Sequence, residues 1–414
     1  MIYNLASSAH RKENINMKKI AIISRALHMN GATKALVEML RRIDYEVVEI
    51  DLWVLDFSNM AEAWVAQIPE KVRIREIPRY EISTGIFCKI MRNPIHFVKS
   101  IVAGYKLKYE KEMILQWKYT AQRLPVIQEK YDVAISFRHF DIDVFYVIKN
   151  IKAQKKYFWV HGVQEISTRE IEILNPYYKK YNGVFPVSVT AKKNIENFFP
   201  SLKDKCKVAY CVVDAKEIIE KAKKAVELFD KEGIDIIFTI ARLGEEKGVD
   251  IAIEAAKILM DRNIEFKWYV AGDGNQRKNY ENMVEKYGLK DKFILLGNVS
   301  NPYGMLKECT IYVQPSRLES YGLAINEAKI LKKSIVCSDI AAGREQILDG
   351  ETGVLVGLSG EKFADAIQTL LKNKELRENL EINLNGAYSH FEAVDILKSL
   401  YLMKYNFSIV RAYF

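Results

Sequence analysis

The chain has 414 residues and a mass of 47.8 kDa, a length typical of two or three domains. Apolar residues make up 49% of the sequence and charged residues 28%, which excludes a disordered or fibrous protein. No apolar run approaches the roughly 18–20 residues of a membrane-spanning helix, and the polar segment before Lys19 lacks the apolar core of a signal peptide. We therefore expect a cytoplasmic protein, with Met17 as an alternative start.

The net charge of +9 is unevenly distributed along the chain. Residues 1–232 hold 39 Lys and Arg against 28 Asp and Glu, a balance of +11, whereas residues 233–414 hold 23 against 25, a balance of −2. A basic half is typical of proteins that bind nucleic acid, anionic membranes or anionic substrates, and equally of a solubilising surface. The five cysteines are scattered and none forms Cys-x-x-Cys, which indicates buried thiols in a reducing compartment and no structural metal.

Short apolar runs predict strands throughout the chain, with helical patterns between them. In the first half, the predicted strands are Lys19–Ser24, Glu46–Leu52, Asp132–Ser136, Tyr157–Val160, Gly183–Val187 and Lys207–Val213, and the predicted helices include Thr33–Arg42 and Thr190–Phe198. A charged helical stretch, Lys216–Asp230, joins the two halves. In the second half, the predicted strands are Asp235–Ala241, Phe266–Ala271, Phe293–Leu296, Ile311–Gln314 and Ile335–Ser338, and the predicted helices are Val249–Arg262, Gln276–Tyr287, Tyr303–Glu308 and Leu323–Leu331.

This alternation of strands and helices predicts two doubly wound α/β domains that face each other across a cleft. We expect an N-terminal domain at residues 17–213 and a C-terminal domain at residues 214–384, with a C-terminal helix from about 385–414 that packs back on the first domain. Ligands of such sheets bind beyond the carboxyl ends of the strands. The loops at those ends are therefore the places to look for a site.

The loop after the predicted strand Asp235–Ala241 carries two cations, Arg242 and Lys247, beside glycines and a helix start. A guanidinium, an ammonium and backbone N–H groups at a helix N-terminus all favour a diphosphate, although a solvated turn has the same composition. The loop after the next strand contains Gly272-Asp273-Gly274. This Gly-x-Gly lacks the third glycine of a dinucleotide-binding fingerprint, because Arg277 stands in its place.

A third loop follows the predicted strand Ile311–Gln314 and carries two carboxylates eight positions apart, Glu319 and Glu327. We expect Glu319 in the loop and Glu327 about one turn into the following helix, where they can accept hydrogen bonds from sugar hydroxyls. Between them, Tyr321-Gly322-Leu323 offers backbone N–H groups to an anion at the helix start. A glutamate pair at this spacing is also common on ordinary protein surfaces.

Taken together and in this order, the three loops resemble those of the retaining nucleotide-sugar glycosyltransferases with two Rossmann-like domains (GT-B), specifically the large group 1 family, family 4. The residues that match are Arg242 and Lys247 of a Gly/Ala-Arg-Leu…Lys-Gly motif, the Gly272-Asp273-Gly274 turn, and Glu319 and Glu327 of a Glu-x7-Glu motif. The resemblance is strong from about Asp235 to Val356 and weaker over Lys19–Asp214. Two departures are Ser320-Tyr321 in place of the family's Gly-Phe and Lys332-Lys333-Ser334 where many members carry Gly-x-Pro.

The resemblance implies a role for each matching residue. Arg242 and Lys247 hold the donor diphosphate, Glu319 contacts the donor sugar and Glu327 contacts the ribose. The donor-binding set is completed by Gly272, Gly274, Ser320 and the backbone of Tyr321, Gly322 and Leu323. In the first half, Gly31 and Ala32 resemble the family's glycine-rich loop, although Asn30 stands where the family often has another glycine, and His161 resembles a histidine near the donor sugar.

The expected function is therefore transfer of a sugar, preferably from a UDP-sugar, to a hydroxyl of a saccharide or lipid-linked saccharide in bacterial surface polysaccharide or glycoconjugate synthesis. The resemblance implies retention of the anomeric configuration, catalysis by Arg242, Lys247, Glu319 and His161, and no cofactor, the nucleotide sugar being a substrate. A nucleotide-sugar 2-epimerase of the same architecture and a non-catalytic partner subunit are the alternatives. Asp141-Ile142-Asp143 spells the Asp-x-Asp metal motif of other glycosyltransferases, but this short pattern arises readily by chance, so we predict no metal.

Residues 85–130 are basic and rich in apolar side chains, with nine Lys and Arg against three Glu. Phe97, Ile101, Tyr105 and Tyr109 recur every fourth residue, which predicts one face of an amphipathic helix. Such a helix suits the anionic inner face of a membrane, while helices packed on the first sheet with solvated lysines explain the pattern nearly as well. No nucleic-acid-binding motif accompanies the charge, so we do not expect a nucleic-acid partner.

Overall fold

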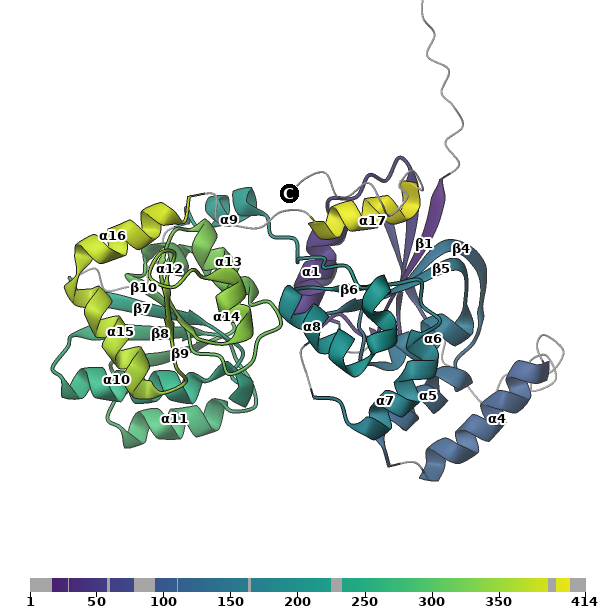
Figure 1. Ribbon diagram of the computed structural model, residues 1–414, viewed down its shortest axis with the longest axis horizontal. Helices are drawn as coiled ribbons and strands as arrows, with labels where there is room; N and C mark the ends of the chain where they lie inside the picture. The colour runs from purple at the N-terminus through teal and green to yellow at the C-terminus, as the bar shows by residue number, and fades with distance from the viewer. Residues whose placement is uncertain are drawn as a thin grey trace, which may run out of the picture. The chain divides into compact units, whose positions relative to one another are not determined.

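The computed structural model describes residues 17–28, 30–57, 60–77, 94–109, 111–162, 165–224, 233–385 and 392–402. These residues form two six-stranded parallel sheets flanked by helices, the two-Rossmann-domain architecture that the sequence predicts (Figure 1). The strand orders are β3-β2-β1-β4-β5-β6 and β12-β11-β10-β7-β8-β9. Counted within its own sheet, each follows the order 3-2-1-4-5-6 of a dinucleotide-binding domain.

The elements of the first sheet and its helices are β1 (Lys18–Ser24), α1 (Gly31–Leu40), β2 (Val48–Val54), α2 (Glu62–Val65), β3 (Val72–Glu76), α4 (Pro94–Tyr109), α5 (Met113–Arg123), β4 (Ile127–Ser136), α6 (Ile142–Asn150), β5 (Ile151–Val160), α7 (Thr168–Tyr178), β6 (Gly183–Pro186) and α8 (Val189–Phe198). Those that follow are α9 (Ala215–Lys221), β7 (Asp235–Ile240), α10 (Val249–Asp261), β8 (Phe266–Ala271), α11 (Arg277–Lys286), β9 (Phe293–Gly297), α12 (Tyr303–Glu308), β10 (Ile311–Gln314), α13 (Leu323–Ile330), β11 (Ser334–Ser338), α14 (Ala341–Gln346), β12 (Val354–Val356), α15 (Gly360–Lys372), α16 (Lys374–Asn383) and α17 (Glu392–Leu402).

The chain divides into two compact units. Unit 1 comprises Met1–Phe158, Ile173–Asn182 and Ile396–Phe414, and unit 2 comprises Trp159–Glu172 and Gly183–Asp395. The domain boundaries near residues 213 and 384 that the sequence suggests stay a prediction.

Unit 2 buries apolar side chains on both faces of its sheet. On one face, β-strand residues such as Trp268 and Val313 pack with α10, α11 and α15. On the other face, residues such as Phe238 and Tyr312 pack with α12 and α13. Because a parallel strand covered on both sides is apolar along its whole length, β8 and β10 were predicted with their observed bounds.

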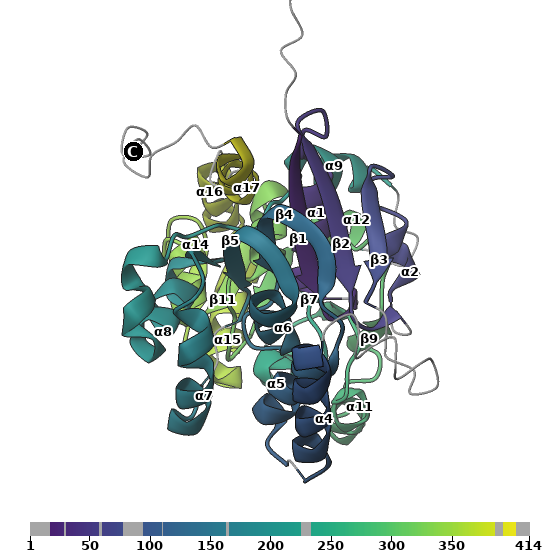
Figure 2. The same cartoon turned by 90° about the vertical axis from the view of Figure 1, so that its right-hand side faces the viewer.

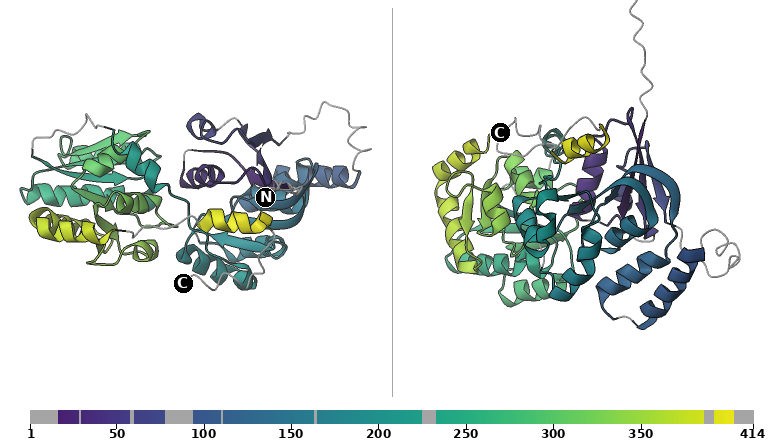
Figure 3. Two further views of the ribbon diagram at one scale, coloured as in Figure 1. Left: turned by 90° about the horizontal axis from the view of Figure 1, so that it is seen from above. Right: turned by 45° about the vertical axis from the view of Figure 1, so that its right-hand side comes forward.

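In unit 1, helices are stacked outward from the sheet. α6 contacts β1 and β4, α5 contacts α6, and α4 contacts α5. In Figure 2 and in the right-hand view of Figure 3, α4 and α5 (dark blue) form the outer part of this stack.

Three sequence predictions for the strands were wrong: one predicted segment is not a strand, and both β3 and the short strand β12 were missed. The segment Lys207–Val213 is not a strand, because it makes only scattered hydrogen bonds to β6, from Lys207 N to Val184 O (3.0 Å) and from Ala209 N to Pro186 O (2.8 Å). The strand β3 was missed, because its Arg73 and Arg75 are polar and interrupt the apolar pattern. The edge position of β3 accommodates these arginines, since an edge strand has one side open to solvent.

Candidate functional site

The three loops singled out in the sequence meet at the carboxyl edge of the second sheet. The loop after β7 is hydrogen-bonded to the loop after β8, from Leu243 N to Asp273 O (3.0 Å). It is also bonded to the loop after β10, from Arg317 N to Glu246 O (2.9 Å). The predicted donor-binding residues of these loops therefore belong to one continuous surface of unit 2.

Glycines make the close approach of these loops possible. Gly248 precedes α10 with a φ of 64°, and a Cβ atom there would lie 2.1 Å from the Pro315 carbonyl oxygen. A Cβ atom at Gly272 would lie 1.9 Å from the carbonyl oxygen of Ala241, and one at Gly274 would lie 2.4 Å from that of Leu243. Any side chain at these positions would push the loops apart, so the glycines set the shape of the edge.

Lys247 and Glu319 form an ion pair across two of these loops. Lys247 Nζ lies 2.8 Å from Glu319 Oε1, and the two side chains are only 21% and 10% exposed. The same oxygen also accepts hydrogen bonds from Ser316 Oγ (2.9 Å) and Gln314 Nε2 (3.1 Å). These contacts hold the Glu319 carboxylate in one orientation. The sequence did not identify Gln314 or Ser316 as residues of the site.

Arg242 is held more loosely than Lys247. Its guanidinium pairs with Glu246, four residues later in the same loop, and its side chain is 57% exposed. An exposed pair of this kind contributes little to stability. The guanidinium can therefore exchange Glu246 for an anionic ligand at small cost.

The backbone of the turn between Glu319 and α13 is held in one conformation by its neighbours. Gly322 has a φ of 84° and precedes the helix, and Tyr321 is buried. Gln346, at the end of α14, donates from Nε2 to the carbonyl oxygens of Tyr321 and Gly322, the second at 3.2 Å. Gln346 is a functional candidate that the sequence did not reveal, because it reaches the turn from 24 positions away.

Glu327 lies one turn into α13, as predicted, and is buried. It accepts a hydrogen bond from the Tyr303 hydroxyl at 3.4 Å. Burial raises the pKa of Tyr312 well above its usual value, and the negative charges of Glu327 and Glu319 raise it further. Both carboxylates therefore lie close enough to this one tyrosine for their charges to act on it.

The remaining predicted residues lie at strand ends of the first sheet. Gly31 and Ala32 are the first two residues of α1, where Asn30 caps the helix by accepting a hydrogen bond from Thr33 N (2.9 Å). His161 directly follows β5 and is half-buried. The positions match the expected strand-end loops, and the roles of these residues in binding or catalysis stay predictions.

The two aspartates of Asp141-Ile142-Asp143 have structural partners. Asp141 caps α6 through Ile142 N (2.7 Å) and pairs with Arg25 (3.5 Å), while Asp143 is fully buried and accepts a hydrogen bond from Arg25 N (3.2 Å). Burial, and then the charge of Asp141, raise the pKa of Asp143 well above its usual value. Within the described part of the chain, no three His, Cys, Asp or Glu side chains gather where they could hold a metal ion.

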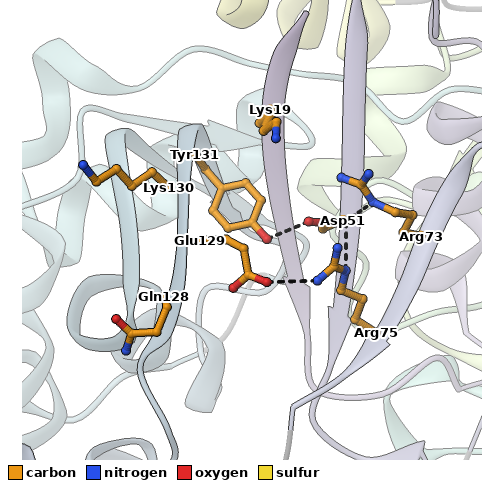
Figure 4. Close-up of a pocket in the computed structure, with 8 residues that line it drawn as sticks. All are labelled: Lys19, Asp51, Arg73, Arg75, Gln128, Glu129, Lys130 and Tyr131. Carbon is orange, nitrogen blue, oxygen red and sulfur yellow. Dashed lines mark hydrogen bonds and ion pairs between the residues drawn. The ribbon is translucent and has the colours of Figure 1, made fainter. Parts of the chain in front are cut away.

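A separate polar hollow of about 530 Å³ lies over the first sheet, lined by residues of β1 to β4 (Figure 4). At its centre, the buried carboxylate of Asp51 accepts hydrogen bonds from Tyr131 (2.7 Å) and Arg73 (2.6 Å) and pairs with Arg75 (3.1 Å). These contacts fasten the edge strand β3 to its neighbours. The hollow lies toward the amino ends of the strands, away from the edge where such sheets bind ligands.

The comparisons with known proteins agree with this geometry. Residues 220–385 match the model of the family described as glycosyl transferases group 1. These residues form a group 1 glycosyltransferase domain. This glycosyltransferase domain contains the three loops at the edge of the second sheet and the Lys247–Glu319 pair.

Two curated relatives illustrate the match. The chain is 31% identical over 205 residues to alpha-D-kanosaminyltransferase of Streptomyces kanamyceticus. The aligned residues cover 47% of this chain and 53% of the relative. It is 26% identical over 229 residues to the N-acetylgalactosamine-N,N'-diacetylbacillosaminyl-diphospho-undecaprenol 4-alpha-N-acetylgalactosaminyltransferase of Campylobacter jejuni, which covers 55% of this chain and 60% of the relative. The chain thus spans a little over half the length of these relatives.

Among solved structures, the chain resembles Alr3699/HepE of Anabaena, crystallised with UDP. The TM-score is 0.68 at 14% identity, with 94% of this chain and 99% of that chain covered. A likeness at this identity shows the shared GT-B fold. Among the described residues, no helix has the length and apolar character that crossing a membrane requires.

Proposed function

We propose that the chain is a retaining glycosyltransferase that moves a sugar from a nucleotide sugar, preferably a UDP-sugar, to a hydroxyl acceptor. The observation that carries the proposal is the joining of the three loops at one edge of the sheet, with Lys247 and Glu319 in contact. The similar Anabaena Alr3699/HepE structure, a complex with UDP, supports a uridine nucleotide. Retention is inferred from the family resemblance.

The proposed roles of the site residues follow from where negative charge develops during sugar transfer. As the glycosidic bond breaks, the leaving nucleoside diphosphate gains charge beside Arg242, Lys247 and the N-terminal N–H groups of α10. A preorganised donor of this kind is typically worth about 10²–10³ in rate. Glu319 accepts hydrogen bonds from the donor sugar and Glu327 from the ribose, and His161 lies near the sugar.

Because side chains and backbone hold the diphosphate charge, the proposed reaction needs no metal and no cofactor. Asp141 and Asp143 remain structural in this proposal, since each already binds backbone or arginine groups. Activity in excess EDTA tests this part. Complete loss of activity, restored by Mn²⁺, would instead assign a metal to the aspartates.

The acceptor is proposed to be a saccharide or a lipid-linked saccharide of a bacterial surface polysaccharide or glycoconjugate. The name of the Campylobacter jejuni relative includes a diphospho-undecaprenol-linked saccharide, which supports the lipid-linked class.

The experiment is a thermal-shift panel of UDP-, GDP- and ADP-sugars followed by product analysis. A ligand at 100 times its dissociation constant adds about 2.7 kcal/mol to the unfolding free energy, so the right donor gives a clear shift. The donor is then incubated with and without saccharide acceptors, and NMR determines the anomeric configuration of the product. An epimer formed from the donor alone identifies an epimerase, and binding without any product identifies a non-catalytic subunit.

A further inference from the structure

The outermost helix of unit 1, α4, exposes an apolar face. Val98, Ile101, Val102 and Tyr105 are 59%, 57%, 50% and 70% exposed. They are spaced i, i+3, i+4 and i+7, which places them along one side of the helix. Ala103, on the opposite side, is 1% exposed. The helix therefore packs against the protein through the side that carries Ala103. Its larger apolar side chains face solvent.

The packing of α4 explains this arrangement. α4 contacts α5, and α5 in turn buries Ile114 and Leu115 and contacts α6. In Figure 1, α4 lies at the outer end of this stack, with its side away from α5 uncovered by other described elements of unit 1. The face differs from the predicted stripe in one respect: it is centred on Val98, Ile101, Val102 and Tyr105, while the exposure of Phe97 and Tyr109 lies outside the described residues.

Lysines gather beside this face. Lys99 and Lys106 lie seven positions apart on one flank of α4, and both are exposed. Lys99, Lys118 of α5 and Lys180, which follows α7, come close to Lys149 of α6. The ammonium groups of Lys106 and Lys118 lie 5.7 Å and 5.6 Å from the centre of the Tyr119 ring. Burial lowers the pKa of Lys149, and the positive charges of Lys180, Lys99 and Lys118 lower it further. These cations from four segments of unit 1 therefore form one basic cluster next to the apolar face.

We propose that the apolar face of α4, together with this basic cluster, docks the protein on an anionic lipid bilayer. The aliphatic side chains and Tyr105 enter the boundary between headgroups and acyl chains, and the lysines contact the anionic headgroups. A contiguous exposed apolar face marks an interaction site. An anionic lipid bilayer is the partner that suits both the apolar face and the basic cluster. Nucleic acid offers no apolar partner for Val98, Ile101 and Val102. A second copy of this surface would bring like charges together.

Co-sedimentation of the full chain with vesicles tests the proposal. The vesicles contain either phosphatidylglycerol and phosphatidylcholine or phosphatidylcholine alone. We expect binding to the anionic vesicles only, weakened by salt. Lys99→Glu/Lys106→Glu should weaken binding by about fivefold or more for each cation removed. Ile101→Ser/Val102→Ser/Tyr105→Ser should weaken it by at least about tenfold, because the buried apolar area is lost.

Matched variants control for general effects of charge and apolarity. Lys278→Glu/Lys286→Glu on α11 makes the same charge change, and Leu348→Ser/Ile382→Ser removes two residues that are 60% and 61% exposed in unit 2. Both should bind vesicles like the wild type. Thermal unfolding and the shift with UDP should be unchanged in all variants, so failure of docking is distinguishable from failure of the proposed function.

Three results would overturn the proposal. The first is no binding to anionic vesicles at low salt. The second is an equal loss of binding in the α4 variants and in the unit 2 controls. The third is a dimer in light scattering that the Ile101→Ser/Val102→Ser/Tyr105→Ser variant disperses, which would assign the face to a second copy of the chain.

Discussion

Lys247 Nζ lies 2.8 Å from Glu319 Oε1, although the two residues are 72 positions apart in the sequence. The pair joins the loop that carries the expected diphosphate ligands to the loop that carries the expected sugar ligand. Each residue therefore sets the electrostatic environment of the other. A change at Glu319 should alter binding of the diphosphate as well as binding of the sugar.

Glu319→Gln should separate the two effects. The amide keeps the size of the side chain but removes the charge that neutralises Lys247, so affinity for bare UDP should be higher. Affinity for the UDP-sugar should fall by about tenfold, as expected for a lost hydrogen bond to a charged group. Calorimetry with the two ligands measures the difference, and equal losses for both ligands would remove Glu319 from the sugar site.

Glu327→Gln should weaken UDP and the UDP-sugar alike, because the ribose is common to both ligands. We expect a loss of about tenfold for each ligand, again the value of a charge-assisted hydrogen bond. Tyr303→Phe is the control, since it removes the hydroxyl that donates to Glu327 and leaves the carboxylate in place. If Tyr303→Phe reproduces the whole loss, Glu327 acts through the packing of α13 and does not contact the ribose.

Gly248→Ala should destabilise unit 2 and reduce donor binding, because the new methyl group would meet the Pro315 carbonyl oxygen at 2.1 Å. Gly288→Ala is a matched control, since Gly288 also has a positive φ, of 70°, but no atom within 4 Å of an added Cβ. The control should cost about 1–2 kcal/mol of unfolding free energy from backbone strain alone. Gly248→Ala should cost roughly 1–3 kcal/mol more, from overpacking. Equal unfolding free energies for the two variants would mean that the loops are not in contact as described.

Lys329 should make the protein more stable as the pH rises from 8 to 10.5. It is 7% exposed, its Nζ donates to Gln346 O (2.9 Å), and burial lowers its pKa from 10.5 to about 8. Because the folded-state pKa is depressed, the unfolded chain binds more protons in this range. The contribution of Lys329 is therefore fully present above pH 10.5 and is lost as the pH falls through 8.

Lys329→Met should remove that part of the pH dependence, which is roughly 3 kcal/mol at most. Denaturant unfolding at pH 7.5 and pH 10 measures it, with Lys374→Met, an exposed lysine of α16, as the comparison. The Lys374→Met protein should keep the wild-type difference between the two pH values. An unchanged difference in Lys329→Met would show that Lys329 is not desolvated in the folded protein.

The sequence predicted the second sheet well because its signals are local. β8 and β10 are short apolar runs bounded by turn residues. Gly248, Gly272 and Gly322 mark the loops after β7, β8 and β10. The predicted ligands Arg242, Lys247 and Glu319 lie in those loops and Glu327 lies in the first turns of α13, for the same reason. Local pattern fails where a strand contains charge, as in β3, whose Arg73 is stabilised by Asp51 on the neighbouring strand.

The residues that orient the site could not be predicted from local pattern. Gln314 and Ser316 fix Glu319, and Gln346 fixes the turn at Tyr321 and Gly322. Their importance depends on which residues the fold brings into contact. The presence of a polar residue near a strand end in the sequence does not show those contacts. The apolar face of α4 is an intermediate case, because the helical period was visible but the packing that exposes Val98 and Val102 was not.

Calorimetric titration of UDP into the full chain tests directly whether the loops after β7, β8 and β10 bind the donor diphosphate. The wild type and an Arg242→Ala/Lys247→Ala variant are compared with Arg262→Ala, a control at the opposite end of α10, where Arg262 pairs with Asp365 (2.8 Å). We expect UDP to bind the wild type and the control equally. The double variant should bind UDP about 100-fold more weakly while unfolding at the same temperature, since two charge-assisted contacts are lost. Wild-type affinity for UDP in the double variant would contradict the assignment of these loops to the donor diphosphate.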